Sequence, residues 1–119
     1  MTLLRVVTSP DRATAILDAL LAVGIAGMTV TDVQGTSAQQ RHRVSYRGTG
    51  YDIGFVPRVE LQMVLRDEWV GDAINEILET ARDEALGENR IFVLPIEAVY
   101  RIRTGEVETS TDSTVPWFL

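Results

Sequence analysis

The 119-residue chain contains no cysteine and no lysine, and its one histidine is His42. Without cysteine it can form no disulfide bond, thiolate metal site or cysteine nucleophile. Without lysine, every cationic contact must come from a planar guanidinium, and lysine amine chemistry is excluded. A lone histidine in a polar stretch is more often solvated than catalytic. We therefore expect no histidine-based active site and no metal site.

Long apolar runs are also missing. No stretch approaches the roughly 18 apolar residues of a membrane span, and the N-terminus shows no signal peptide. These absences predict a cytoplasmic protein. The phosphate-loop, dinucleotide-binding and zinc-protease motifs do not occur either, so the residues alone indicate no enzyme.

The chain is acidic overall, with a formal net charge of −6. Nucleic-acid binding requires a basic surface, so this charge argues against a nucleic-acid partner. The acids are concentrated from Asp67 to Glu88. Hydrophobic residues make up 45% of the chain, which is enough for one domain with its own core.

The apolar periodicity predicts two successive strand–helix–strand units. In the first unit, the helix begins at Ser9–Asp11 and ends at Gly24. In the second, Asp67 caps a helix that runs from Glu68 to about Ala85. Its expected buried stripe consists of Val70, Ala73, Ile74, Ile77, Leu78 and Ala81. The expected strands cover Leu3–Thr8, Met28–Val33, Pro57–Leu65, Ile91–Leu94 and Val99–Arg103.

This order predicts an α+β fold, a ferredoxin-like βαββαβ sandwich whose helices lie on one face of an antiparallel sheet. We expect the helices to cover Leu4, Val6, Met28, Val30, Leu61 and Met63. Apolar residues at alternate positions, such as Val7 and Val64, then face away from the helices and favour self-association. Residues 1–106 form the predicted domain and residues 107–119 a flexible C-terminal tail. Its apolar end, Val115–Leu119, docks on the domain or on a partner.

The polar segment Thr36–Val56 is predicted to be a loop of about twenty residues, far longer than an ordinary connection. Loops of this length are mostly functional or disordered. The segment contains three arginines and the tyrosines Tyr46 and Tyr51. We expect it to project from the domain and to contact a partner.

Anion binding is the chemistry that the residues favour most. A turn at Gly87–Asn89 can present backbone N–H groups, and Arg90 adds a positive charge. Arg101 and Arg103 are expected side by side on one face of a strand. Three guanidiniums near such a turn can hold a polyphosphate. The spacing is equally compatible with arginines that pair with the acidic second helix.

With these features the chain resembles the P-II family of nitrogen-regulatory signal proteins along nearly its whole length. The stretches that carry the resemblance are Gly24–Thr31, Tyr46–Gly48 with Tyr51, Phe55–Val59, Arg90–Val93 and Arg101–Glu106. The resemblance implies a homotrimer whose sheets line its centre, with ATP or ADP in the clefts between subunits. It also implies a long T-loop, about residues 36–56. Through this loop each subunit regulates a protein target, a transporter or a metabolic enzyme, in nitrogen or carbon metabolism.

The resemblance also implies roles for individual residues. Those near the nucleotide are Thr29, Gln62, Val64, Gly87, Glu88, Asn89, Arg90, Arg101 and Arg103. Gln39 and Arg58 fall where the family holds a small carboxylate effector, 2-oxoglutarate, and the Mg²⁺ that accompanies ATP. Tyr51 matches the loop tyrosine that some members have uridylylated.

The chain departs from the family pattern at both ligand positions. Thr36–Gln40 replaces a glycine-containing stretch that wraps the oxo-acid, Arg58 replaces a lysine, and Asn89 replaces a glycine. Three alternatives stay open. The chain is a carbon-side relative that senses bicarbonate with ADP or AMP, a slow phosphohydrolase at the same cleft, or a trimer whose effector site has decayed.

Overall fold

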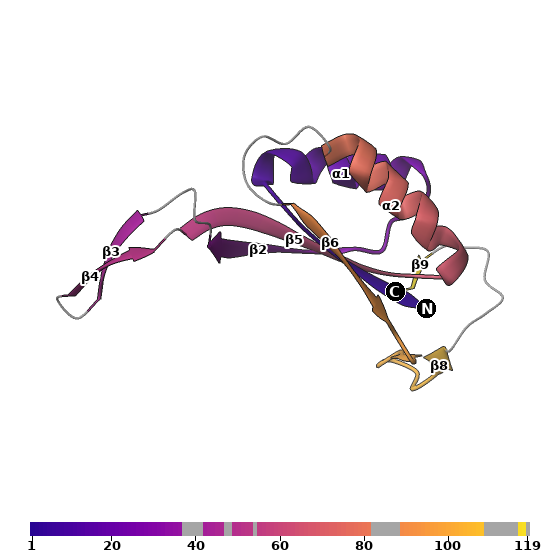
Figure 1. The fold of residues 1–119 in the computed structure, drawn as a ribbon. Coiled ribbons are helices and arrows are strands. Elements are labelled where there is room, and N and C mark those ends of the chain that lie inside the picture. Colours follow the sequence, from indigo (N-terminus) through magenta and orange to yellow (C-terminus); the bar gives the residue numbers. More distant parts are fainter. Residues whose placement is uncertain (37–41, 47–48, 54, 82–88, 109–116, 119) are drawn as a thin grey trace.

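Two helices cover one face of an antiparallel sheet in the computed structural model, which describes residues 1–36, 42–46, 49–53, 55–81, 89–108 and 117–118 (Figure 1). The elements in chain order are β1 (Thr2–Thr8), α1 (Pro10–Ala22), β2 (Thr29–Thr36), β3 (His42–Tyr46), β4 (Thr49–Ile53), β5 (Phe55–Leu65), α2 (Asp67–Ala81), β6 (Arg90–Pro95), β7 (Val99–Tyr100), β8 (Val107–Glu108) and β9 (Trp117–Phe118). The long strands lie in the order β2-β5-β1-β6, and each neighbouring pair is antiparallel. This arrangement confirms the predicted ferredoxin-like fold.

Each helix begins next to the end of a strand. Ser9 is the N-cap of α1, Pro10 is the first helical residue, and Gly24 follows the helix end with a φ of 91°. These positions agree with the sequence, because glycine adopts positive φ without a steric cost. Asp67 is the first residue of α2 and not its cap as predicted. Its Oδ1 instead accepts a hydrogen bond from Thr2 Oγ1 at 2.8 Å. The predicted end of this helix, near residue 85, lies outside the described residues.

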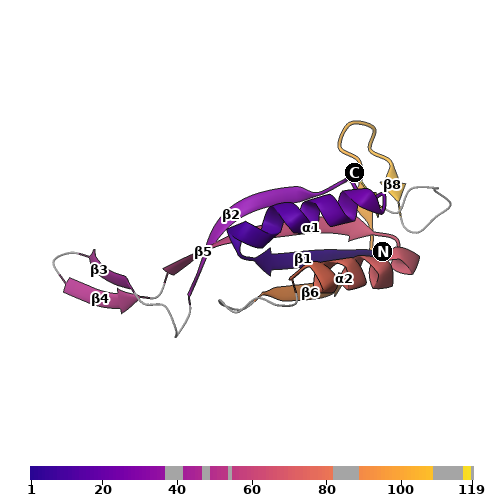
Figure 2. The same cartoon turned by 90° about the horizontal axis from the view of Figure 1, so that it is seen from above.

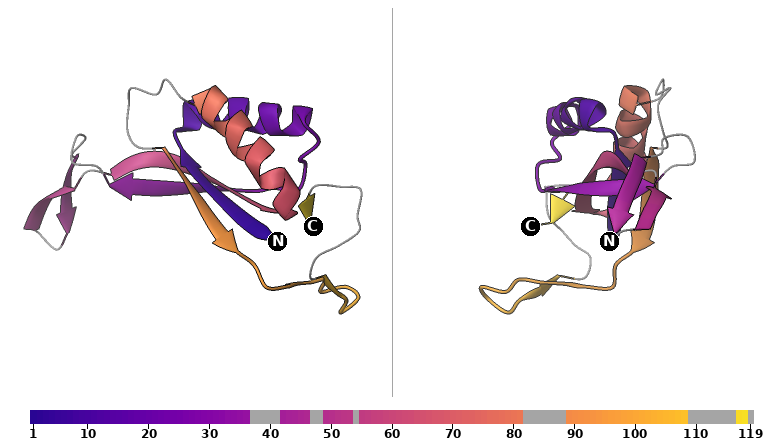
Figure 3. Two further views of the ribbon diagram at one scale, coloured as in Figure 1. Left: turned by 45° about the vertical axis from the view of Figure 1, so that its right-hand side comes forward. Right: turned by 90° about the vertical axis from the view of Figure 1, so that its left-hand side faces the viewer.

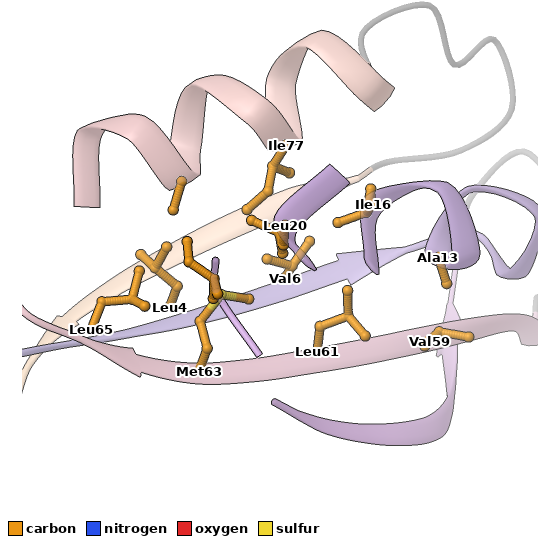
Figure 4. Close-up of a cluster of buried hydrophobic side chains, with 12 residues drawn as sticks. Leu4, Val6, Ala13, Ile16, Leu20, Val59, Leu61, Met63, Leu65 and Ile77 are labelled. Carbon is orange, nitrogen blue, oxygen red and sulfur yellow. The ribbon is translucent and has the colours of Figure 1, made fainter. Parts of the chain in front are cut away.

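The hydrophobic core fills the space between the helices and the central strands (Figure 4). It consists of Leu4, Val6, Ala13, Ile16, Leu20, Ile25, Val59, Leu61, Met63, Leu65, Ala73 and Ile77. On β1 and β5 these residues alternate with residues of the opposite face, as the period of two in a strand requires. Fully burying one large aliphatic side chain contributes about 1.5–3 kcal/mol, so this cluster is the main source of stability.

Two residues that were predicted to be covered lie at the margin of the core. Val30 is opposite Leu61 in the register and therefore on the helix side, yet it is 52% exposed. The reason is that β2 is an edge strand, outside the area that the helices cover (Figure 2). Leu78 is 45% exposed because the buried stripe of α2 is centred on Ala73 and Ile77.

The described strands between Thr36 and Val56 project from the domain, as expected, and they form a hairpin that the sequence did not predict. β2 continues to Thr36, β5 already begins at Phe55, and β3 and β4 pair as an antiparallel hairpin between them (Figure 1). Val44, Tyr46 and Tyr51 are residue types with a high strand propensity. Their preference for strands was masked by the polar residues and glycines around them.

The described C-terminal residues contain two short strands, β8 and β9, that the sequence did not predict. The expected strand Val99–Arg103 ends at Tyr100, and β7 pairs with β8 in a hairpin closed by residues 101–106. β9 pairs with β5, with Phe118 opposite Val64 and Trp117 opposite Leu65. Of the two possibilities for the apolar end of the chain, docking on the domain is therefore confirmed.

Candidate functional site

The face of the sheet away from the helices contains part of the predicted nucleotide site. We define this open face as the alternate residues of β1 that start at Leu3, together with their register partners on β5 and β6. Its apolar members are Leu3, Val7, Val64, Phe92 and Leu94. Val7 and Val64 thus face away from the helices, as predicted.

Polar side chains cross the middle of the open face. Arg5 Nε lies 2.8 Å from Glu60 Oε1, which forms an ion pair between β1 and β5. The same carboxylate oxygen accepts a hydrogen bond from Gln62 Nε2 at 3.4 Å. Thr29 is opposite Gln62 across β2 and β5. Three of the residues expected near the nucleotide, Thr29, Gln62 and Val64, are therefore neighbours on one face.

Asn89 and Arg58 meet at the end of the sheet where β6 begins. Asn89 Oδ1 accepts hydrogen bonds from the backbone N–H of Ser9 at 3.2 Å and from Arg58 Nη1 at 3.4 Å. Arg58 is only 7% exposed, although it is charged. Its Cγ lies 3.4 Å from the position that a Cβ on Gly35 would occupy, so its stem packs over the end of β2. The structure thus joins a predicted nucleotide-binding residue to a predicted effector-binding residue.

Arg58 is a buried cation whose described hydrogen-bond partner is a neutral amide. Within the described part of the chain, no carboxylate pairs with it. Burying a charge without an opposite charge is unfavourable. An anion at this position would therefore be held strongly, through a charge-assisted contact with a planar guanidinium.

Arg101 and Arg103 lie in the turn of the β7–β8 hairpin and not on a strand as predicted. The Arg101 N–H donates to the Glu106 carbonyl and the Gly105 N–H donates to the Arg101 carbonyl, both at 2.8 Å. Gly105 has a φ of 74°, and the Glu106 N–H donates to Thr104 Oγ1 at 3.2 Å. These bonds close the turn around an open cavity of about 350 Å³, lined by Tyr100, Arg101, Ile102, Arg103 and Thr104.

The hairpin is exposed and lies far from the start of β6. Tyr100 is 70% exposed and Ile102 is fully exposed. Arg90 is opposite Val7 at one end of β1, whereas Pro95 is opposite Thr2 at the other end, and the hairpin follows Pro95. Figure 3 shows the hairpin beyond that far end, on the side of the sheet away from α2. One chain therefore does not bring Arg90 together with Arg101 and Arg103.

Four of the predicted site residues are outside the described part of the chain or are described by their backbone alone. Gly87, Glu88 and Gln39 lie outside the described residues, and Tyr51 is placed by its backbone, opposite Val44 in the β3–β4 hairpin. Among the described residues, no group of three or more His, Asp or Glu side chains is arranged to hold a metal ion. No helix in the same part of the chain is long and apolar enough to cross a membrane.

Comparison with known proteins agrees with the fold. A model of the family described as Nitrogen regulatory protein P-II matches residues 1–106. The chain belongs to the P-II family. It is 42% identical over 100 residues to the Nitrogen regulatory protein P-II of Pasteurella multocida, covering 84% of this chain and 89% of the relative. With the same coverage of both chains, it is 39% identical to the Nitrogen regulatory protein P-II 1 of Escherichia coli K12 and 37% identical to the Nitrogen regulatory protein P-II of Cereibacter sphaeroides.

Membership in the P-II family confirms the resemblance and supports a role in signal transduction. The sequence did not predict the two contacts of Asn89 or the ion pair between Arg5 and Glu60. Opposite charges on two strands indicate an ion pair only when the two strands are known to be neighbours in the sheet. For Asn89, the sequence offers no comparable signal.

Proposed function

We propose that this P-II protein binds an adenine nucleotide, ATP or ADP, between neighbouring copies of a homotrimer. The observation that carries the proposal is the separation of Arg90 from Arg101 and Arg103 along one chain. A polyphosphate that uses all three guanidiniums requires the hairpin of a second copy. Three copies arranged head to tail close into a ring, and each contact between them then holds one equivalent site.

The open face supports this assembly. Its apolar residues include Phe92, which is 44% exposed in the single chain. Burying these residues against other copies is favourable. The Arg5–Glu60 ion pair neutralises two of the charges on the face, so burial of the face leaves neither of these two charges without a partner.

The environment of Arg58 supports a small carboxylate effector, 2-oxoglutarate or bicarbonate. A carboxylate supplies the negative charge that the described surroundings of Arg58 lack. We place Gln39 and the Mg²⁺ that accompanies ATP in the same effector site, on the resemblance to the family. The effector then reports on carbon and nitrogen metabolism.

The projecting hairpin supports regulation of a protein target. β3 and β4 lie at the far end of the molecule from β9 and the β7–β8 hairpin (Figure 1). They are therefore free to enter a partner without disturbing the sheet. We propose that ligand occupancy changes the position of this T-loop, that its target is a cytoplasmic enzyme or a transporter, and that Tyr51 is its site of covalent modification. A ligand shifts such an equilibrium only by its difference in affinity between the two loop positions.

Titration of the purified protein tests the proposal. Light scattering should give the mass of three chains, and calorimetry should detect binding of ATP, ADP or AMP. Arg101→Ala or Arg103→Ala should weaken that binding by about 1.5–3 kcal/mol for each lost charge-assisted bond. Separate titrations with 2-oxoglutarate and with bicarbonate distinguish the two effectors. Failure of all three nucleotides to bind the wild-type protein would overturn the proposal.

A further inference from the structure

The side chain of Asn89 joins three segments that are far apart in the chain. Its Oδ1 accepts from Ser9, which is 80 positions away, and from Arg58, which is 31 positions away. Ser9 is the N-cap of α1, so its N–H is fixed by the start of a helix. Asn89 itself directly precedes Arg90, the first residue of β6. One amide oxygen thus connects α1, β5 and the candidate phosphate-binding turn.

Arg58 extends this connection to the base of the projecting segment. Its side chain is enclosed, with 7% exposure, and its stem packs over Gly35. Gly35 and Thr36 are the last two residues of β2. The guanidinium is therefore held at one end by Asn89 and along its stem by the strand that leads into the T-loop. The guanidinium has five N–H donors, and the described hydrogen bond engages one of them, with Asn89 as the acceptor. The orientation of the Arg58 guanidinium therefore depends on Asn89.

We propose that Asn89 is a positioning residue that couples the nucleotide site to Arg58 and the base of the T-loop. The inference rests on the proposed function, since it needs a nucleotide beside Arg90. A nucleotide that orders residue 90 also orders Asn89, and Asn89 in turn fixes Arg58. Each ligand then stabilises the same contact, so the second ligand loses less conformational entropy when it binds. The coupling is positive: a nucleotide strengthens the binding of an anion at Arg58, and the anion strengthens nucleotide binding by the same factor.

A double-mutant cycle measures the coupling without an effector. The variants are Asn89→Gly, which removes the acceptor, Arg58→Met, which keeps the stem and removes the donors, and the combination of the two. Calorimetry with ATP gives the affinity of each. Arg58→Met should weaken ATP binding about fivefold when Asn89 is present, the effect of one modest hydrogen bond. In the Asn89→Gly background it should change the affinity by less than about twofold, because the contact is already lost.

Two controls separate this coupling from a general loss of structure. Arg101→Ala removes a candidate phosphate contact on the hairpin, so its effect on ATP affinity should be the same in both backgrounds. Asn89→Asp keeps an acceptor oxygen for Ser9 and Arg58. It should therefore retain the dependence on Arg58, although its charge lowers ATP affinity overall. Circular dichroism confirms that each variant is folded.

The outcomes are distinguishable from failure of the proposed function. If the wild-type protein binds ATP and the effects of Arg58→Met and Asn89→Gly simply add, the coupling role of Asn89 is wrong while the nucleotide site stands. If the wild-type protein binds no nucleotide, the proposed function fails and the coupling fails with it. A non-additive cycle together with an additive Arg101→Ala control supports the coupling.

Discussion

Mixed assemblies of two variants give the sharpest test of a site shared between chains. The variants are Arg90→Ala, which removes the guanidinium at the start of β6, and Arg103→Ala, which removes one in the turn of the β7–β8 hairpin beyond the other end of β6. Loss of one charge-assisted hydrogen bond costs about 1.5–3 kcal/mol, which corresponds to roughly 10- to 100-fold weaker affinity for ATP. Each variant alone therefore leaves every site without one of its arginines. At an ATP concentration near the wild-type Kd, nearly all of these sites remain empty.

The two variants are then unfolded together in equal amounts and refolded. In a ring where Arg90 of one copy meets Arg103 of the next, half of the copies keep Arg90 and half of their neighbours keep Arg103. About a quarter of all sites in the refolded mixture then regain both arginines. Calorimetric titration with ATP reports this fraction as the stoichiometry of high-affinity binding, and each variant refolded alone is the control. A mixture that binds no more ATP than the separate variants would refute the shared site, because mixing cannot restore a site within one chain.

Three further predictions concern the fold that holds the site. Gly105→Ala should destabilise the β7–β8 hairpin by about 1 kcal/mol, because φ is 74° there, although the surrounding space is open. Gly71→Ala, in the exposed face of α2, should instead stabilise the protein by about 0.5–1 kcal/mol. Hydrogen exchange measures the first effect and thermal unfolding the second, and effects of the same sign would contradict the reasoning. The hydrogen bond from Thr2 lowers the pKa of the Asp67 carboxyl below its ordinary value of 3.8. The stability that this bond adds is therefore present above pH 3.8 and is lost as the pH falls through the lower pKa of the folded state. The Tm of the wild-type protein and that of Asp67→Asn should converge in acid, and a difference that stays constant with pH would contradict this prediction. Leu61→Ala should cost about 2–5 kcal/mol in chemical unfolding, because Leu61 is fully buried on β5, and a cost below about 1 kcal/mol would contradict this packing.

The fold was predictable where one residue pattern persists along a whole element. The residues of β1 and β5 alternate between the core and the open face, and the start of α1 has Ser9 and Pro10 at its expected positions. Such patterns report burial directly. The exposure of Val30 depends instead on which strand lies at the edge of the sheet. That property belongs to the topology, and the local sequence does not contain it.

The candidate site was predictable only in part, because some of its contacts also depend on the topology and not on the local sequence. The turn at Gly105 has a local signal, a glycine after Arg103-Thr104, but the alternation of Tyr100 to Arg103 favoured a longer strand. The contacts of Asn89 join residues that no local pattern relates. The residue types alone therefore indicated anion binding, and the folded chain showed which of those residues are close together.

The pairing of β2 with β5 has a mechanical consequence. The two strands are joined over eight residues, Thr29–Thr36, a ladder about 26 Å long at about 3.3 Å per residue. A shift of one strand along the other has a high free-energy cost, because a shift by one residue turns every side chain to the opposite face. Tilting is easier where β5 has no second neighbour, because its pairing with β1 ends at Val59 and the last four residues of β2 pair with β5 beyond that point. Over these four residues, about 13 Å, a rotation of about 5° moves the Thr36 end by about 1 Å. This end of the ladder can therefore change the direction of the projecting hairpin without breaking the hydrogen bonds between β1 and β5.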